Sequence, residues 1–114
     1  MARDNVQLSA LGDPTRRRIF ELVGTRPRTV VEITRELTVS QSAVSQHLKV
    51  LRDGGLVVSR PEGTRRIYRL NPQGVAALRT WLEGVWDQAL TDFQKAAEQA
   101  ADDNRFANPE QEQP

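Results

Sequence analysis

The sequence contains no cysteine and a single histidine, His47, among its 114 residues. The absence of cysteine excludes disulfide bonds, thiolate metal sites and cysteine nucleophiles. No apolar run approaches the roughly 20 residues that a membrane-spanning helix needs, and residues 1–13 lack the apolar core of a secretory signal. We therefore expect a cytoplasmic protein that has no membrane partner.

The features of an enzyme are also missing. The sequence shows no nucleophile–base pair, no metal-ligand cluster and no glycine-rich phosphate loop, so we expect no catalytic activity. Hydrophobic residues make up 38% of the chain and charged residues 27%, which is typical of a globular domain. The length predicts a single domain, over residues 1–101. Residues 102–114 are acidic, glutamine-rich and contain proline, so we expect a disordered tail there.

Charge is distributed unevenly along the chain, although the net charge is only +1. Residues 1–70 hold 13 Lys and Arg against 7 Asp and Glu, a balance of +6. Residues 71–114 hold 3 against 8, a balance of −5. A basic first part is typical of a surface that meets a polyanion. Chance clustering in a small protein is the alternative.

Helix start signals occur at several points. Asp13 precedes Pro14, Thr29 is followed by Glu32 in the spacing of a capping box, and Ser40 precedes a further apolar pattern. In the first of these helices, three consecutive arginines, Arg16–Arg18, either contact phosphate or form a solvated face. The predicted helices cover residues 6–11, 14–23, 30–37, 41–53 and 73–100, and a β-hairpin with a turn at residues 61–64 covers residues 56–70.

The helix predicted over residues 41–53 has two contrasting sides. Its apolar residues Val44, Leu48 and Leu51 fall on one side and predict the buried stripe. The opposite side carries no acid before Asp53; its residues are Ser42, Ser45, Gln46 and Lys49. Serine and glutamine can hydrogen-bond to base edges in a major groove, whereas a carboxylate would be repelled by phosphate. The alternative is an exposed helix with no partner.

The surrounding elements favour nucleic-acid binding. A short helix and a turn precede this helix, and a hairpin follows whose tip is flanked by Arg60, Arg65 and Arg66. A recognition helix followed by a basic hairpin is the arrangement of a winged helix-turn-helix, in which the hairpin meets phosphates or the minor groove.

Three segments together resemble the ArsR/SmtB family of bacterial repressors, over residues 7–90: LGDPTRRRIFELV, VVEITRELTVSQSAVSQHLKVLRDGGLV and RPEGTRRIYRL. The resemblance implies a homodimer with the element order α-α-α-α-β-β-α, each subunit meeting one half of an inverted repeat. It also implies base readers on the recognition helix and contacts from the wing. With Ser40 and Lys49 added from the helix pattern, the expected DNA-binding residues are Ser40, Gln41, Ser42, Ser45, Gln46, Lys49, Thr64, Arg65 and Arg66.

The chain departs from the metal-sensing members of that family. Those members carry a cysteine motif on the helix before the recognition helix, where this chain reads VVEITREL, or histidine and aspartate ligands on the last helix, which here has no histidine. A divalent metal ion would need a non-cysteine site built from His47 and acids of the last helix and tail. The candidates are Asp87, Asp92, Glu98, Asp102 and Asp103. The alternative is a structural histidine and a solvated acidic face.

The last predicted helix carries an apolar stripe wider than one neighbouring element needs. Trp81 and Trp86 lie on different sides of it, so both cannot enter one small core. We expect a subunit interface there, helped by the first helix, with packing inside one subunit as the alternative. The expected interface residues are Leu8, Leu11, Leu78, Trp81, Leu82, Val85, Trp86 and Leu90.

These observations predict a sequence-specific, dimeric DNA-binding transcriptional repressor that binds an inverted repeat in a promoter. Two alternatives stay open. One is a metal-responsive repressor that uses the carboxylate and histidine site described above. The other is a winged-helix protein-interaction module that does not bind DNA.

Overall fold

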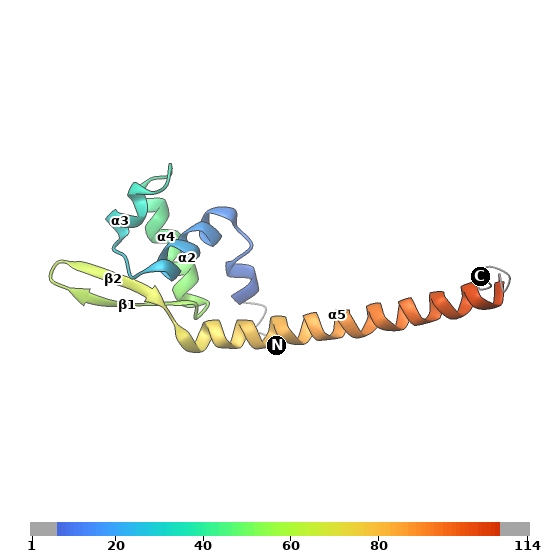
Figure 1. Ribbon diagram of the computed structural model, residues 1–114. Coiled ribbons are helices and arrows are strands. Elements are labelled where there is room, and N and C mark those ends of the chain that lie inside the picture. Colours follow the sequence, from blue (N-terminus) through green and yellow to red (C-terminus); the bar gives the residue numbers. More distant parts are fainter. Residues whose placement is uncertain (1–6, 108–114) are drawn as a thin grey trace. The chain divides into compact units, whose positions relative to one another are not determined.

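The computed structural model describes residues 7–107 (Figure 1). Residues 7–10 are helical, and the expected start of this first helix at Val6 lies outside the described residues. The elements that follow are α2 (Pro14–Thr25), α3 (Val30–Arg35), α4 (Gln41–Asp53), β1 (Val57–Glu62), β2 (Arg65–Leu70) and α5 (Pro72–Ala107). The predicted class and element order, helices with one two-stranded hairpin before the last helix, are confirmed. The chain divides into two compact units, with the boundary in the sequence between Arg79 and Thr80.

The helix starts predicted from the sequence are confirmed. The Asp13 carboxylate accepts hydrogen bonds from the backbone N–H groups of Thr15 and Arg16, at 2.8 and 3.0 Å. Thr29 and Glu32 form the expected capping box at α3. Ser40 Oγ accepts from the Ala43 N–H at 3.1 Å and begins α4. Each cap satisfies backbone donors that the helix cannot satisfy itself.

The core of the first unit lies where α2, α3 and α4 meet the start of β1. The predicted stripe of α4 is confirmed, because Val44, Leu48 and Leu51 are fully buried. The buried core residues are Ala10, Ile19, Leu22, Val23, Ile33, Val44, Leu48, Leu51, Leu56 and Val57. Packing this side of α4 against the core leaves its opposite side facing outward.

The hairpin turn is shorter than the sequence predicted. Pro61 and Glu62 belong to β1, and only Gly63 and Thr64 form the turn between the paired Glu62 and Arg65. Gly63 has a φ of 64°, as the first position of a tight type II′ turn requires. Proline is tolerated in β1 because the strand lies at the edge of the sheet.

The end of α4 packs closely against the start of α5. Gly55, with a φ of 79°, adopts the left-handed conformation expected for the end of α4. Its carbonyl oxygen accepts a hydrogen bond from Asn71 Nδ2 at 2.9 Å. A Cβ atom on Gly74 would lie only 1.8 Å from the same oxygen. A residue without a side chain is therefore needed in the first turn of α5.

Helix α5 continues past the predicted end at residue 100. The tail was expected from Asp102, but residues 102–107 are helical, and residues 108–114 lie outside the described part. Gln99 Nε2 donates to Asp103 Oδ1 at 3.0 Å, a contact one helical turn apart that favours continuation. No helix within residues 7–107 is both long and apolar enough to cross a membrane.

Candidate nucleic-acid interface

The outer side of α4 is exposed and polar. Ser40, at the cap, is also exposed. The exposed side chains on α4 are the predicted Gln41, Ser42, Ser45, Gln46 and Lys49. In the described part of the chain Lys49 makes no ion pair, so its charge is not neutralised by a neighbouring carboxylate. The helix thus presents hydrogen-bonding groups and one cation, all held by a buried stripe on its other side.

A groove of about 400 Å³ lies between α3, α4 and the hairpin. It brings together five of the predicted residues from two elements: Gln41 and Ser45 of α4, and Thr64, Arg65 and Arg66 of the hairpin tip. The structure places Ser40, Ser42, Gln46 and Lys49 outside the lining of this groove. The predicted residues therefore form a groove with an adjoining exposed helix side.

Four further residues line the groove and were not among the predicted DNA-binding residues: Thr29, Val30, Val31 and Tyr68. Val31 is 41% exposed, which is unusual for a large aliphatic side chain on a helix that faces the core. The apolar pattern of residues 30–37 does predict this, since Val30, Ile33 and Leu37 share one face and Val31 lies off it. Nothing in the pattern indicates that Tyr68 would reach the same place.

The arginines of the hairpin differ in their surroundings. Arg60 pairs with Glu62 at 3.5 Å, and both side chains are exposed. Arg66 Nε donates to Ser59 Oγ across the two strands at 3.3 Å. Arg65 has no ion-pair partner among the described residues. The groove therefore receives the charge of Arg65 and Arg66, while Arg60 is partly neutralised by its neighbour.

The arginines at the start of α2 face other parts of the same unit. Arg16 Nε donates to the Ala10 carbonyl oxygen at 2.7 Å, and Arg17 Nη1 donates to the Leu11 carbonyl oxygen at 3.3 Å. Arg18 pairs with Glu21 at 3.6 Å. The sequence predicted either a phosphate contact or a solvated face for these arginines. Arg16 fits neither, because it is half-buried and holds the end of the first helix against α2.

His47 has the structural role expected for it. Arg16 Nη1 donates to Nδ1 of the half-buried ring at 3.4 Å, since a guanidinium has no acceptor. Among the described residues, no three side chains of His, Asp or Glu gather as ligands for a metal ion. Asp92 and Asp103 of the proposed ligand set instead accept hydrogen bonds from Gln88 and Gln99, each at 3.0 Å.

Two carboxylates have pKa values lowered by helix capping. Hydrogen bonds from the backbone N–H groups of Arg16 and Thr15 hold the pKa of Asp13 below its ordinary value of 3.8. The backbone N–H of Thr29 lowers the pKa of Glu32 below its ordinary 4.5, with a smaller contribution from Arg26. Asp13 stabilises the start of α2, and Glu32 stabilises the start of α3, which lines the groove.

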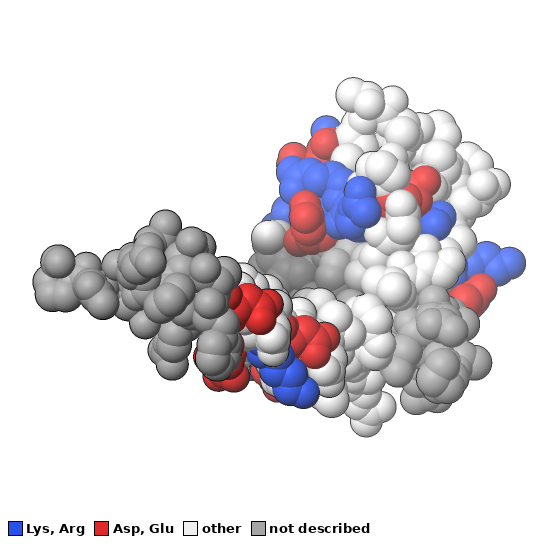
Figure 2. All heavy atoms as spheres, turned by 90° about the vertical axis from the view of Figure 1, so that its right-hand side faces the viewer, with Lys and Arg blue, Asp and Glu red and all other residues white. Residues whose placement is uncertain are grey.

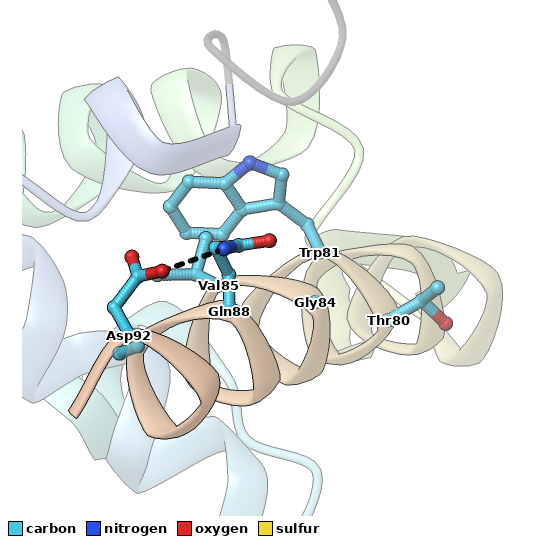
Figure 3. Close-up of a pocket in the computed structure, with 7 residues that line it drawn as sticks. Thr80, Trp81, Gly84, Val85, Gln88 and Asp92 are labelled. Carbon is cyan, nitrogen blue, oxygen red and sulfur yellow. Dashed lines mark hydrogen bonds between the residues drawn. The ribbon is translucent and has the colours of Figure 1, made fainter. Parts of the chain in front are cut away.

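The second unit carries exposed apolar side chains on α5. Of the predicted interface residues, Leu82, Val85, Trp86 and Leu90 are exposed, and Phe93, which the prediction omitted, is 71% exposed. Figure 3 shows Trp81, Val85, Gln88 and Asp92 on one side of this helix, beside a hollow of about 580 Å³ at Gly84. Leu8 of the first unit is also exposed, whereas Leu11 and Leu78 pack in part against the core of their own unit.

The described residues on the face drawn in Figure 2 form no extended patch of one charge. Lys and Arg side chains lie there next to Asp and Glu side chains. A surface of mixed charge is typical of a solvated region and gives a polyanion no preferred place to bind. The groove and the outer side of α4 are therefore the stronger candidates for a functional surface.

Comparisons with known proteins point to one family. A family model described as a helix-turn-helix domain matches residues 11–60. The HTH-type transcriptional regulator Rv2034 of Mycobacterium tuberculosis is 51% identical over 94 residues, which cover 82% of this chain and 88% of that protein.

Solved structures agree with this relationship. A crystal structure described as a possible transcriptional regulator for arsenical resistance is 41% identical, with a TM-score of 0.66, and the match covers 75% of this chain and 94% of that one. A homodimeric winged helix-turn-helix DNA-binding domain from Mycobacterium bovis, described as a possible ArsR-family transcriptional regulator, is 33% identical, with a TM-score of 0.60. That match covers 76% of this chain and 78% of the other.

Proposed function

Because this chain belongs to the ArsR family of winged helix-turn-helix transcriptional regulators, we propose that it is a homodimeric repressor that binds an inverted repeat in duplex DNA. The observation that carries the proposal is the groove, which unites polar residues of α4 with two arginines of the hairpin. The protein acts in the cytoplasm, where it blocks transcription by occupying a promoter. The element order and the homodimeric relative support this function.

Helix α4 enters the major groove and reads bases. Gln41, Ser42, Ser45 and Gln46 are exposed, and their side chains can both donate and accept hydrogen bonds. The N-terminal end of the helix, capped by Ser40, directs positive partial charge toward a phosphate. No carboxylate precedes Asp53 on this helix to oppose the approach of DNA.

The hairpin and the groove hold the DNA backbone. Arg65 and Arg66 provide the charge, and Thr64 provides a hydroxyl group at the same groove. Lys49, further along α4, contacts a phosphate on the same side. Such contacts carry most of the affinity but little sequence information, since every base step has the same phosphates.

The exposed apolar side of α5 forms the subunit interface. Five apolar side chains of this helix are each 44–71% exposed: Leu82, Val85, Trp86, Leu90 and Phe93. Contiguous exposed apolar side chains mark protein–protein interfaces. A twofold dimer presents two copies of α4, which meet two half-sites about one DNA turn apart. The symmetry of the dimer therefore predicts an inverted repeat.

The proposal is tested by titrating the full-length protein against its own upstream DNA and against random duplex, at several salt concentrations. We expect binding to both at low salt and a preference for the upstream sequence that survives at higher salt. Failure to bind either duplex, even at low salt, would favour the protein-interaction module. Measuring the transcript made from this promoter in vitro distinguishes a repressor from an activator. We expect less transcript when the protein is added.

Arg65→Ala separates backbone contacts from base contacts. We expect weaker binding to all sequences and a salt dependence reduced by about one unit for each half-site, because one phosphate contact is lost. Ser45→Ala should instead change the preference among bases and leave the salt dependence unchanged. Lys95→Ala, which removes one charge from an exposed site of the second unit, is the matched control and should bind like the original protein.

A further inference from the structure

Arg28 is a buried arginine in the segment between α2 and α3. The residue is 9% exposed, although no carboxylate pairs with its guanidinium within the described part of the chain. Its Nε donates to the Leu22 carbonyl oxygen at 2.8 Å, and its Nη2 donates to Thr25 Oγ1 at 2.9 Å. A buried charge is costly unless it is hydrogen-bonded, so these two bonds define where the side chain can lie.

Both acceptors of Arg28 belong to the last turn of α2. The carbonyl groups of that turn have no partners within the helix and carry the negative end of the helix dipole. Thr25 Oγ1 also donates to the Leu22 carbonyl oxygen at 2.8 Å, which keeps the two acceptors together. The side chain of Arg28 is thereby fixed to the end of α2.

The backbone of Arg28 pairs with the middle of β2. Its N–H donates to the Tyr68 carbonyl oxygen at 3.0 Å, and the Tyr68 N–H donates to the Arg28 carbonyl oxygen at 2.8 Å. This bridge adds one residue of a third strand to the hairpin. A hairpin of two strands is marginally stable by itself, so the bridge is a main point of attachment for the wing.

The position of Arg28 relates these contacts to the groove. Thr29, the next residue, caps α3 and lines the groove, and Tyr68 and Arg66 of β2 line the same groove. Arg28 therefore connects the end of α2, the start of α3 and the strand that carries the arginines of the wing. The buried guanidinium cannot itself reach DNA.

We propose that Arg28 is a positioning residue, which holds the hairpin so that Arg65 and Arg66 reach the DNA backbone. The inference rests on the proposed function, since it concerns how the same interface is held. Without the two side-chain hydrogen bonds of Arg28, the hairpin samples more orientations. Binding of DNA by the tip must then also fix the orientation of the hairpin, which costs conformational entropy. The arginines of the tip then contribute less to binding although they are still present.

A double-mutant cycle tests this coupling, with Arg28→Met paired with Arg65→Ala and affinity for the upstream duplex as the measurement. In the original background Arg65→Ala should weaken binding by about tenfold for each half-site, the value of one charge-assisted hydrogen bond. In the Arg28→Met background the same change should cost less than about threefold, and the salt dependence should already be reduced. Arg28→Lys, whose ammonium can donate to the same acceptors, should restore part of the coupling.

Two further variants distinguish positioning from general stability. Ile19→Val removes a methylene group from the core of α2 and should lower stability without changing the effect of Arg65→Ala. Thr25→Val removes one acceptor of Arg28 at an exposed position and should give a weaker form of the Arg28→Met result even if Arg28→Met does not fold. Hydrogen exchange of the Tyr68 amide should accelerate in Thr25→Val and not in Ile19→Val when the two are compared at equal global stability.

The outcomes separate the inference from the proposed function. If the original protein binds duplex DNA and Arg65→Ala costs the same factor in all backgrounds, Arg28 has no positioning role and the inference is overturned. If the original protein binds no duplex, the proposed function fails, and with it the role of Arg28 in DNA binding. Reduced coupling in Arg28→Met or Thr25→Val, with unchanged coupling in Ile19→Val, supports the inference.

Discussion

Single residues decide how closely the elements of the first unit approach one another. At Gly74 the first turn of α5 lies against the carbonyl oxygen of Gly55, and Asn71 donates to that oxygen from the same segment. The hydrogen bond between Arg16 and His47 joins α2 to the recognition helix, α4. These contacts set where α4 ends and where α5 begins.

Replacement of Gly74 by alanine should destabilise the first unit by about 2–3 kcal/mol, because the added Cβ would overlap the Gly55 carbonyl and the backbone must shift. Urea unfolding followed by circular dichroism measures the change. Gln73→Ala, at the exposed neighbouring position, should stay within about 0.5 kcal/mol of the original protein. Equal stability of the two variants would show that the helix and the turn can separate at no cost.

Whole elements depend on their caps, and two of the caps are carboxylates. Asp13 begins α2 and Glu32 completes the capping box of α3. Their pKa values are lower in the folded protein than their ordinary values of 3.8 and 4.5. A lowered pKa means that the stabilisation is present above the ordinary value and is lost as the pH falls through the folded pKa. Helices α2 and α3 should therefore weaken in acid.

We expect the urea midpoint of the original protein to fall as the pH decreases from about 5 to about 3, because both caps become protonated. The double variant Asp13→Asn and Glu32→Gln keeps amide groups that can cap a helix but removes the titration. Its midpoint should fall less over the same range. A parallel decline of the two proteins would assign the acid sensitivity to other carboxylates.

At the scale of the whole molecule, charge and apolar surface are separated along the chain. Residues 1–70, with a balance of +6, lie in the unit that contains the groove, and residues 71–114, with a balance of −5, include α5 with its exposed apolar side. Like charges repel, so the acidic part is unsuited to DNA, while its apolar side suits a second copy of the same chain. The two parts of the proposed function thus fall on different parts of the sequence.

Leu82→Glu should convert the dimer into a monomer, because a charge would be buried in the apolar interface. Affinity for the upstream duplex should decrease by at least about 100-fold, since the two half-sites are then bound independently. Analytical ultracentrifugation and the DNA titration measure the two effects. Thr91→Glu adds the same charge on the opposite side of α5 and should remain dimeric. A Leu82→Glu protein that is still dimeric would place the interface elsewhere.

Much of the fold follows from local patterns. The caps at Asp13, Thr29 and Ser40 and the stripe of α4 depend on residues three or four positions apart, so the sequence alone predicted these elements. The polar side of α4 was predictable for the same reason, because burial of one side of a helix defines the other. The tight turn at Gly63 was not predicted, since the edge location that tolerates Pro61 depends on strand pairing.

Tertiary structure determined the contacts between residues that are far apart in the sequence, which no local pattern can predict. Arg28 lies between the helices predicted over residues 14–23 and 30–37, and only folding brings it against the end of α2 and against Tyr68, which is 40 positions further along the chain. The lining of the groove by Thr29 and Val31 and the contact of Arg16 with His47 likewise join distant segments. The sequence by itself determined which side of the recognition helix faces outward; the tertiary contacts determined which residues stand beside it, because their proximity requires the core to form.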